Sequence, residues 1–221
     1  GISSYCLSRK LYTNEMTIFD IMDYAKEQNC THMEIVPFGL PILNDDNTPN
    51  IEFATQVREY AEKIGLFLSA FSLNAHFIFT DEEGNDLPEE KRAECFNAEL
   101  ERVQNVMNVA HEMGIKTFRC DTCSGQRPGG ENTPENFEKD FPYLVEACQK
   151  IADYAATLGM GTTLENHGLY VNGADRLIRI LKAANRPNIG LTVDVGNYLC
   201  VDADPVTEVQ KAIKYADMVH L

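Results

Sequence analysis

Three ionisable residues end or interrupt apolar stretches in the last third of the chain. Glu165 lies in LENHG (residues 164–168), Asp194 in TVDVGN (192–197) and His220 in MVHL (218–221). A charge in such a position is costly unless it is paired or bound to a cation. Two carboxylates and one imidazole from successive strands suit Mn²⁺, Mg²⁺ or Co²⁺ better than a thiolate site would. The pattern predicts one divalent metal ion on these residues, with strand-end salt bridges or hydrogen-bonded polar side chains as the alternative.

Further polar residues follow apolar stretches and could contact a substrate. We expect His167 to hydrogen-bond a substrate hydroxyl, or else to orient a neighbouring metal ligand. The other candidates for substrate contact are Asn197, His76, Glu34, Arg119 and Tyr5. A structural role for His76, an ion pair between Glu34 and Arg119, and core packing of Tyr5 are the competing interpretations.

The elements that must position these residues alternate regularly. Amphipathic segments end at Gly or Asn, which tolerate the left-handed conformation that closes a helix, and a short apolar run follows each of them. Six helices are predicted between the strands, with helix starts at Thr17, Thr133-Pro134 and Asp204-Pro205. The seven predicted strands cover residues 2–7, 31–37, 66–73, 115–120, 160–165, 189–195 and 217–221.

Strict alternation of strands and helices means either a (β/α) barrel or a doubly wound open sheet. No G-x-G-x-x-G or G-x-x-x-x-G-K-[ST] motif follows a strand, so the usual phosphate loops of open sheets are missing. Polar and ionisable residues gather where the strands end, as in a barrel whose C-terminal face carries the chemistry. The sequence therefore predicts an α/β fold of the (β/α)8 TIM barrel type.

The strand count is one short of a closed barrel. An open seven-stranded form would expose two unpaired edges, which invites aggregation. We therefore expect a single barrel domain over residues 1–221 whose eighth strand–helix unit is missing from this chain, or a partner that completes the sheet. A true seven-stranded domain is the alternative.

Composition narrows the class of protein. The 221 residues include 44% hydrophobic and 24% charged residues, which are ordinary values for a globular chain. The formal net charge of −15, with no basic patch, disfavours nucleic acid and anionic membrane surfaces as partners. The start of the chain lacks the features of a signal peptide. Seven cysteines scattered through apolar stretches indicate a reduced, cytoplasmic protein, and the C-x-x-C at residues 120–123 is interpreted as incidental.

The order of elements, with LENHG after the fifth strand, DVGN after the sixth and VHL in the seventh, resembles the sugar phosphate isomerase/epimerase superfamily. This resemblance implies a xylose isomerase-like barrel. It makes Glu165, Asp194 and His220 three of four metal ligands, the fourth being a Glu in an eighth strand beyond residue 221. It also implies that Glu165 acts as an acid/base group. Asn197 stands where the ketose 3-epimerases carry a histidine, which argues against a strict ketose 3-epimerase.

The function expected from this resemblance is a metal-dependent isomerase or epimerase acting on a sugar, sugar phosphate or related polyol ketone. Proton abstraction next to the carbonyl would proceed through an enediolate. A dehydratase or a C-glycoside-cleaving relative shares this first step and stays open, as does a non-catalytic barrel that binds a sugar or a partner protein. An endonuclease-like enzyme is disfavoured by the acidic charge and the five histidines. Relatives are often dimers or tetramers, so a homo-oligomer is a further expectation.

Overall fold

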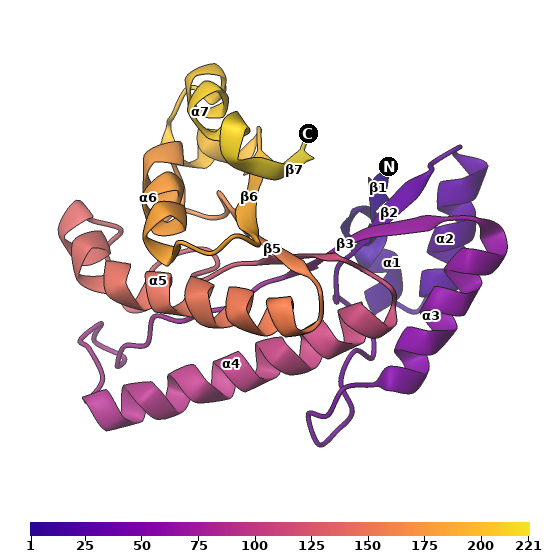
Figure 1. The fold of residues 1–221 in the computed structure, drawn as a ribbon, viewed down its shortest axis with the longest axis horizontal. Coiled ribbons are helices and arrows are strands. Elements are labelled where there is room, and N and C mark those ends of the chain that lie inside the picture. Colours follow the sequence, from indigo (N-terminus) through magenta and orange to yellow (C-terminus); the bar gives the residue numbers. More distant parts are fainter. The chain divides into compact units, whose positions relative to one another are not determined.

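A computed structural model describes residues 1–221 of the chain. Seven strands form a sheet whose strand order follows the chain order from β1 to β7. The strands are β1 (Ile2–Ser3), β2 (His32–Ile35), β3 (Phe67–Leu73), β4 (Thr117–Cys120), β5 (Gly161–Glu165), β6 (Ile189–Asp194) and β7 (Ala216–His220). The α-helices are α1 (Ser8–Tyr12), α2 (Ile18–Glu27), α3 (Ile51–Ile64), α4 (Glu89–Glu112), α5 (Pro134–Thr157), α6 (Ala174–Ala184) and α7 (Pro205–Ala212). This alternation along the chain can be followed by colour in Figure 1.

The chain divides into two compact units. The first comprises residues 1–73, 104–118 and 158–160, and it contains β1, β2 and β3. These three strands pair in parallel, with Ile2 opposite Met33 and His32 opposite Phe67. Its helix α3 begins at Asn50, whose side chain accepts the Phe53 N–H, and ends at Gly65 in the left-handed conformation. Both helix ends therefore use the residue types that satisfy exposed backbone groups.

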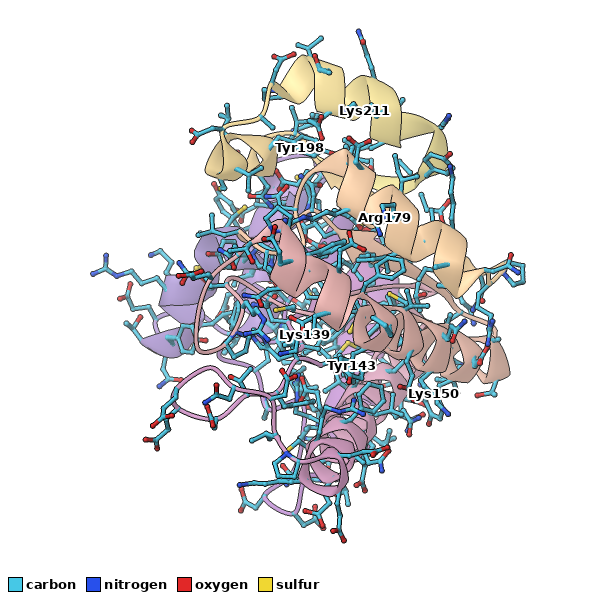
Figure 2. The ribbon with its side chains drawn as sticks, turned by 90° about the vertical axis from the view of Figure 1, so that its left-hand side faces the viewer. Lys139, Tyr143, Lys150, Arg179, Tyr198 and Lys211 are labelled. Carbon is cyan, nitrogen blue, oxygen red and sulfur yellow. The ribbon has the colours of Figure 1, made fainter.

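The second unit comprises residues 74–103, 119–157 and 161–221, and it carries the predicted metal ligands. Its strands β5, β6 and β7 pair in parallel, with Glu165 opposite Thr192 and Asp194 opposite His220. The helices α5 and α6 pack through aromatic and cationic side chains. Arg179 of α6, labelled in Figure 2, lies 4.9 Å from the Phe141 ring centroid of α5.

The seven predicted strands are confirmed, but the first is much shorter than predicted. Only Ile2–Ser3 is strand, and residues 4–7 form the 3-10 helix η1, followed by α1, a helix that the sequence did not indicate. The buried Ser4 hydroxyl accepts the Val36 N–H at 2.8 Å and donates to the Val36 carbonyl at 3.3 Å. A serine side chain thus takes the place of the backbone ladder and turns the chain out of the strand.

Other predicted boundaries agree with the structure to within one or two residues. The capping box at Thr17 is confirmed, because its hydroxyl accepts the Asp20 N–H and the Asp20 carboxylate accepts the Thr17 N–H. Asp204 likewise accepts the Thr207 N–H ahead of Pro205 at the start of α7. A search of the helices for a stretch with the length and hydropathy of a membrane span finds none.

Candidate metal centre

The predicted ligands Glu165, Asp194 and His220 come together at the C-terminal ends of β5, β6 and β7. One donor atom from each lies within 4.8 Å of the others. His220 Nδ1 is 3.1 Å from Glu165 Oε1 and 3.9 Å from Asp194 Oδ2. Parallel strands in register bring their carboxyl ends to one edge, and the pairing of Asp194 with His220 sets these two side chains next to each other. The Glu165 side chain is only 4% exposed, whereas those of Asp194 and His220 are 23% and 28% exposed.

A buried amide fixes the position of Asp194. Asn166 is fully buried, and its Nδ2 donates to the Asp194 carbonyl at 2.8 Å while its Oδ1 accepts the Asp194 N–H at 2.8 Å. The Asp194 side chain is held as well, because Oδ1 accepts the Asn197 N–H at 2.8 Å. The other carboxylate oxygen, Oδ2, is the one that faces His220. The site thus presents one oriented oxygen of Asp194 to a ligand.

Arg119, at the end of β4, contacts one carboxylate oxygen of Glu165, and His220 contacts the other. Its Nη2 forms an ion pair with Glu165 Oε2 and another, at 3.1 Å, with Asp121 Oδ1. The guanidinium is 5% exposed, and its Nη1 donates to Asn74 Oδ1 at 3.0 Å. Burial by itself would raise the pKa of Glu165, but the hydrogen bond from His220 and the charge of Arg119 outweigh it and lower the pKa. Glu165 is therefore a carboxylate at neutral pH.

His167, two residues after Glu165, is oriented by Asp121. Its Nδ1 is 2.7 Å from Asp121 Oδ2, and this hydrogen bond raises the pKa of the imidazole against the opposing effect of burial. The ring is one-third exposed, whereas the Asp121 side chain is 3% exposed. Because Nδ1 is engaged, Nε2 is the nitrogen through which this ring could reach a bound molecule.

The loop that carries His167 is held by a close backbone contact. Leu169 N–H and Tyr170 N–H both donate to the Gly125 carbonyl, at 2.8 and 3.1 Å. A Cβ on Gly168 would come within 2.4 Å of Gly125 Cα, and both glycines have positive φ. Only glycine permits this approach of two loops, so the contact fixes the segment that follows Glu165.

The remaining sequence candidates in this unit are His76 and Asn197. The His76 N–H donates to Glu99 Oε1 at 2.9 Å, its Nδ1 is buried without a hydrogen-bond partner, and burial lowers the pKa of the ring. Asn197 takes part in the site through its backbone. Its N–H donates to Asp194 Oδ1, and its carbonyl accepts a hydrogen bond from Asn172 Nδ2, both at 2.8 Å. Neither residue belongs to the group of possible metal ligands.

Two further candidates, Glu34 and Tyr5, belong to the other compact unit. Glu34 is buried at the end of β2, and its Oε1 accepts a hydrogen bond from the Ser72 hydroxyl. Tyr5 is 60% exposed, and its ring centroid lies 5.8 Å from that of Phe38 with the two ring planes tilted by 54°, so the interpretation of Tyr5 as a core residue is wrong. Its position in η1 rather than in a strand explains the exposure.

Sequence reasoning did not assign a role to Asn166 or to Asp121. The signal for Asn166 was its place directly after Glu165, because an amide at a strand end can bridge to the neighbouring strand. The signal for Asp121 was weaker, since its partner His167 is 46 residues away in the sequence. The cysteines of the C-x-x-C, Cys120 and Cys123, are buried free thiols, which agrees with an incidental spacing.

The residues at the three strand ends fit a divalent cation. Two carboxylate oxygens and one imidazole nitrogen converge. Hydrogen bonds fix the positions of Glu165 and Asp194, and the side chains of Asp194 and His220 are partly exposed to solvent. An oxygen-rich set with one nitrogen is typical of Mg²⁺, Mn²⁺ or Co²⁺ rather than of a thiolate metal site.

A protein-family model described as Xylose isomerase-like TIM barrel matches residues 22–221. The chain belongs to this family, which confirms the predicted fold class and the resemblance drawn from the motifs. A comparison with curated protein sequences finds no significant match.

Solved structures share the fold at low sequence identity. The probable 3-DHS dehydratase AsbF from Bacillus anthracis is 16% identical, with a TM-score of 0.72 over 100% of this chain and 71% of that one. D-psicose 3-epimerase, solved in the presence of D-fructose, is 14% identical, with a TM-score of 0.68 over 93% of this chain and 67% of that one. A xylose isomerase-like TIM barrel protein from Mycobacterium smegmatis, in complex with magnesium, is 17% identical, with a TM-score of 0.63 over 92% and 65%. The chain thus spans about two thirds of the length of these proteins.

Proposed function

We propose that this chain is part of a divalent-metal-dependent isomerase or epimerase that acts on a sugar, sugar phosphate or related polyol ketone. The observation that carries the proposal is the convergence of Glu165, Asp194 and His220 at three successive strand ends, with donor atoms within 4.8 Å of one another. Sugar epimerases and a magnesium complex among the similar structures support the substrate class and the need for a cation.

Glu165, Asp194 and His220 would hold the ion through Oε1, Oδ2 and Nδ1, the atoms that face one another. When bound, a divalent cation polarises a substrate carbonyl and acidifies the neighbouring C–H. Mn²⁺, Mg²⁺ and Co²⁺ are the ions that this donor set favours. The fully buried Asn166 keeps Asp194 in place without touching the ion.

In this proposal Glu165 removes and returns the proton next to the carbonyl. A base must be deprotonated, and the lowered pKa of Glu165 keeps it so at neutral pH. A low pKa also makes a weak base, so the C–H must be acidified before the transfer becomes fast. The substrate then passes through an enediolate, and return of the proton to a different carbon or face gives the isomer or epimer.

His167 would donate or accept a hydrogen bond to a substrate hydroxyl through Nε2. The hydrogen bond between Nδ1 and Asp121 fixes the ring plane, and the one-third exposure of the ring leaves it accessible. Asn197, at the turn after β6, offers an amide where ketose 3-epimerases carry an imidazole. This difference favours a substrate other than that of a strict ketose 3-epimerase, and a dehydratase that shares the first proton transfer is the second candidate.

The first test is the metal content per chain. Protein purified with Mn²⁺ and Mg²⁺ present is expected to retain about one ion per chain, and Asp194→Ala is expected to retain little. Glu146→Ala, which removes an exposed carboxylate of α5, is the matched control and should bind as the wild type does. Absence of metal from wild-type protein would refute the proposed site.

The second test follows the proton. A panel of ketoses, their phosphates and related polyol ketones is incubated with metal-loaded protein in D₂O. Deuterium is expected at the carbon next to the carbonyl, with loss of water in addition if the enzyme is a dehydratase. Asp194→Ala should show no incorporation. An active substrate that turns over without deuterium incorporation would contradict proton abstraction by Glu165.

A further inference from the structure

Two groups of possible metal ligands overlap in this site, and they share Glu165. The first is the proposed centre, Glu165 with Asp194 and His220, and the second is Glu165 with Asp121 and His167. In each group one donor atom per residue lies within 4.8 Å of the others. Two triads joined by a carboxylate are the arrangement from which two-metal sites are built. The donor atoms by themselves would therefore allow either one ion or two.

A nitrogen atom of Arg119 lies between the two carboxylates of the second group. Arg119 Nη2 contacts both Glu165 Oε2 and Asp121 Oδ1, which are oxygens of the two carboxylates in that group. Its contact with Asp121 is an ion pair at 3.1 Å without hydrogen-bond geometry, so charge rather than a directed hydrogen bond holds it there. The guanidinium thus already occupies the space between Glu165 Oε2 and Asp121 Oδ1, where a cation bridging these two oxygens would bind.

Arg119 is also held so that it cannot swing aside. It is 5% exposed, and its Nη1 donates to Asn74 Oδ1 at 3.0 Å. Asn74 is fixed in turn, because its carbonyl accepts from Arg102 Nη2 at 2.8 Å, and Arg102 is paired with Glu99. An incoming ion would have to displace a buried and anchored side chain.

We propose that Arg119 restricts this centre to a single metal ion by occupying the second donor triad. The inference rests on the proposed function, since it presumes that the first triad binds metal. Glu165 would face the ion through Oε1, while Oε2, which pairs with Arg119, keeps a second lone pair for the proton transfer proposed above. Arg119 also keeps His167 from becoming a metal ligand, which leaves that ring for the substrate.

The test replaces the guanidinium by a neutral side chain of similar length. Arg119→Met is expected to bind two Mn²⁺ ions per chain where the wild type binds one. Metal is counted by elemental analysis after gel filtration in Mn²⁺. Electron paramagnetic resonance should show spin-coupled Mn²⁺ in the variant, because the two ions would share Glu165. Arg119→Lys keeps the positive charge and should bind one ion.

A double variant, Arg119→Met with Asp121→Asn, removes one charge of each sign and one ligand of the second triad. It should return to one ion, and its balanced charge favours folding if the single variant fails to fold. Circular dichroism and thermal melting verify the fold of each protein. Titration of wild-type protein with millimolar Mn²⁺ needs no variant and should stop at one ion.

The outcomes separate the two proposals. No metal in wild-type protein would remove the proposed function and this inference with it. One ion in both wild-type protein and folded Arg119→Met would leave the proposed function standing and overturn the role of Arg119. Two ions in wild-type protein, in Arg119→Lys or in the double variant would overturn it as well.

Discussion

Replacing Asp140 by alanine should destabilise the protein far more than replacing another arginine-paired carboxylate on the same helix. Asp140 of α5 is 2% exposed, and Arg127 Nε donates to its Oδ2 at 2.7 Å. The buried Tyr170 hydroxyl donates to the same oxygen at 2.6 Å. Asp153, also on α5, pairs with Arg186 at 2.5 Å, but its side chain is 54% exposed. The two carboxylates differ in burial, not in the distance to their arginine.

The magnitude follows from what the substitution leaves behind. Breaking a buried ion pair by removing one partner costs about 3–5 kcal/mol, because the other charge remains buried. Arg127 keeps two weaker partners, the Gly84 carbonyl at 3.4 Å and Asp86 Oδ1 at 3.6 Å. These place the expected loss at the lower end, about 3 kcal/mol. At about 2–4 °C per kcal/mol for a chain of this size, Tm should fall by about 6–12 °C.

The assay is urea unfolding at pH 7 without metal, followed by circular dichroism. Asp153→Ala should change the free energy of unfolding only slightly, because an exposed pair is screened by water. Tyr170→Phe removes the hydroxyl alone and should cost about 1.5 kcal/mol. Replacing both charges, with Arg127→Met and Asp140→Leu, should recover most of the loss. Equal losses for Asp140→Ala and Asp153→Ala would refute the argument that burial decides the value of these pairs.

Three further predictions concern a loop contact, a helix cap and a histidine. Gly168→Ala should destabilise the protein by about 1–3 kcal/mol in urea unfolding, because its Cβ would meet Gly125 Cα at 2.4 Å. Gly130→Ala is the control and should be neutral, because the space around Gly130 is open. Similar losses of stability in the two variants would contradict the importance of this contact. Asn50→Ala should cost about 1 kcal/mol by the same assay, because the side-chain oxygen caps α3 and the side-chain nitrogen donates to the Pro41 carbonyl, and unchanged stability would show that these bonds contribute nothing. Burial lowers the pKa of His76 below 6.5, so the unfolded chain binds more protons and stability should fall as pH drops below 6.5. His76→Gln should flatten this dependence in unfolding measurements from pH 7 to 5, and an unchanged slope would exclude His76 as its source.

Local patterns in the sequence determined the elements and the three metal-ligand candidates. Apolar runs mark buried strands and the three- and four-residue spacing marks helices, and both signals are read within one segment. Because parallel strands end at one edge, charged residues after β5, β6 and β7 could be expected to meet, and the structure brings Glu165, Asp194 and His220 together.

Only the tertiary structure decided which charges neutralise each other. Arg119 lay among the candidates for substrate contact, but its Nη2 pairs with Glu165 and Asp121 inside the protein. His167 finds its partner Asp121 at a distance of 46 residues along the chain. The shortening of β1 has a similar origin, since Ser4 bonds to Val36, 32 residues away. Periodicity specifies which face of an element is buried, whereas pairing depends on strand register and side-chain direction, which exist only after the chain has folded.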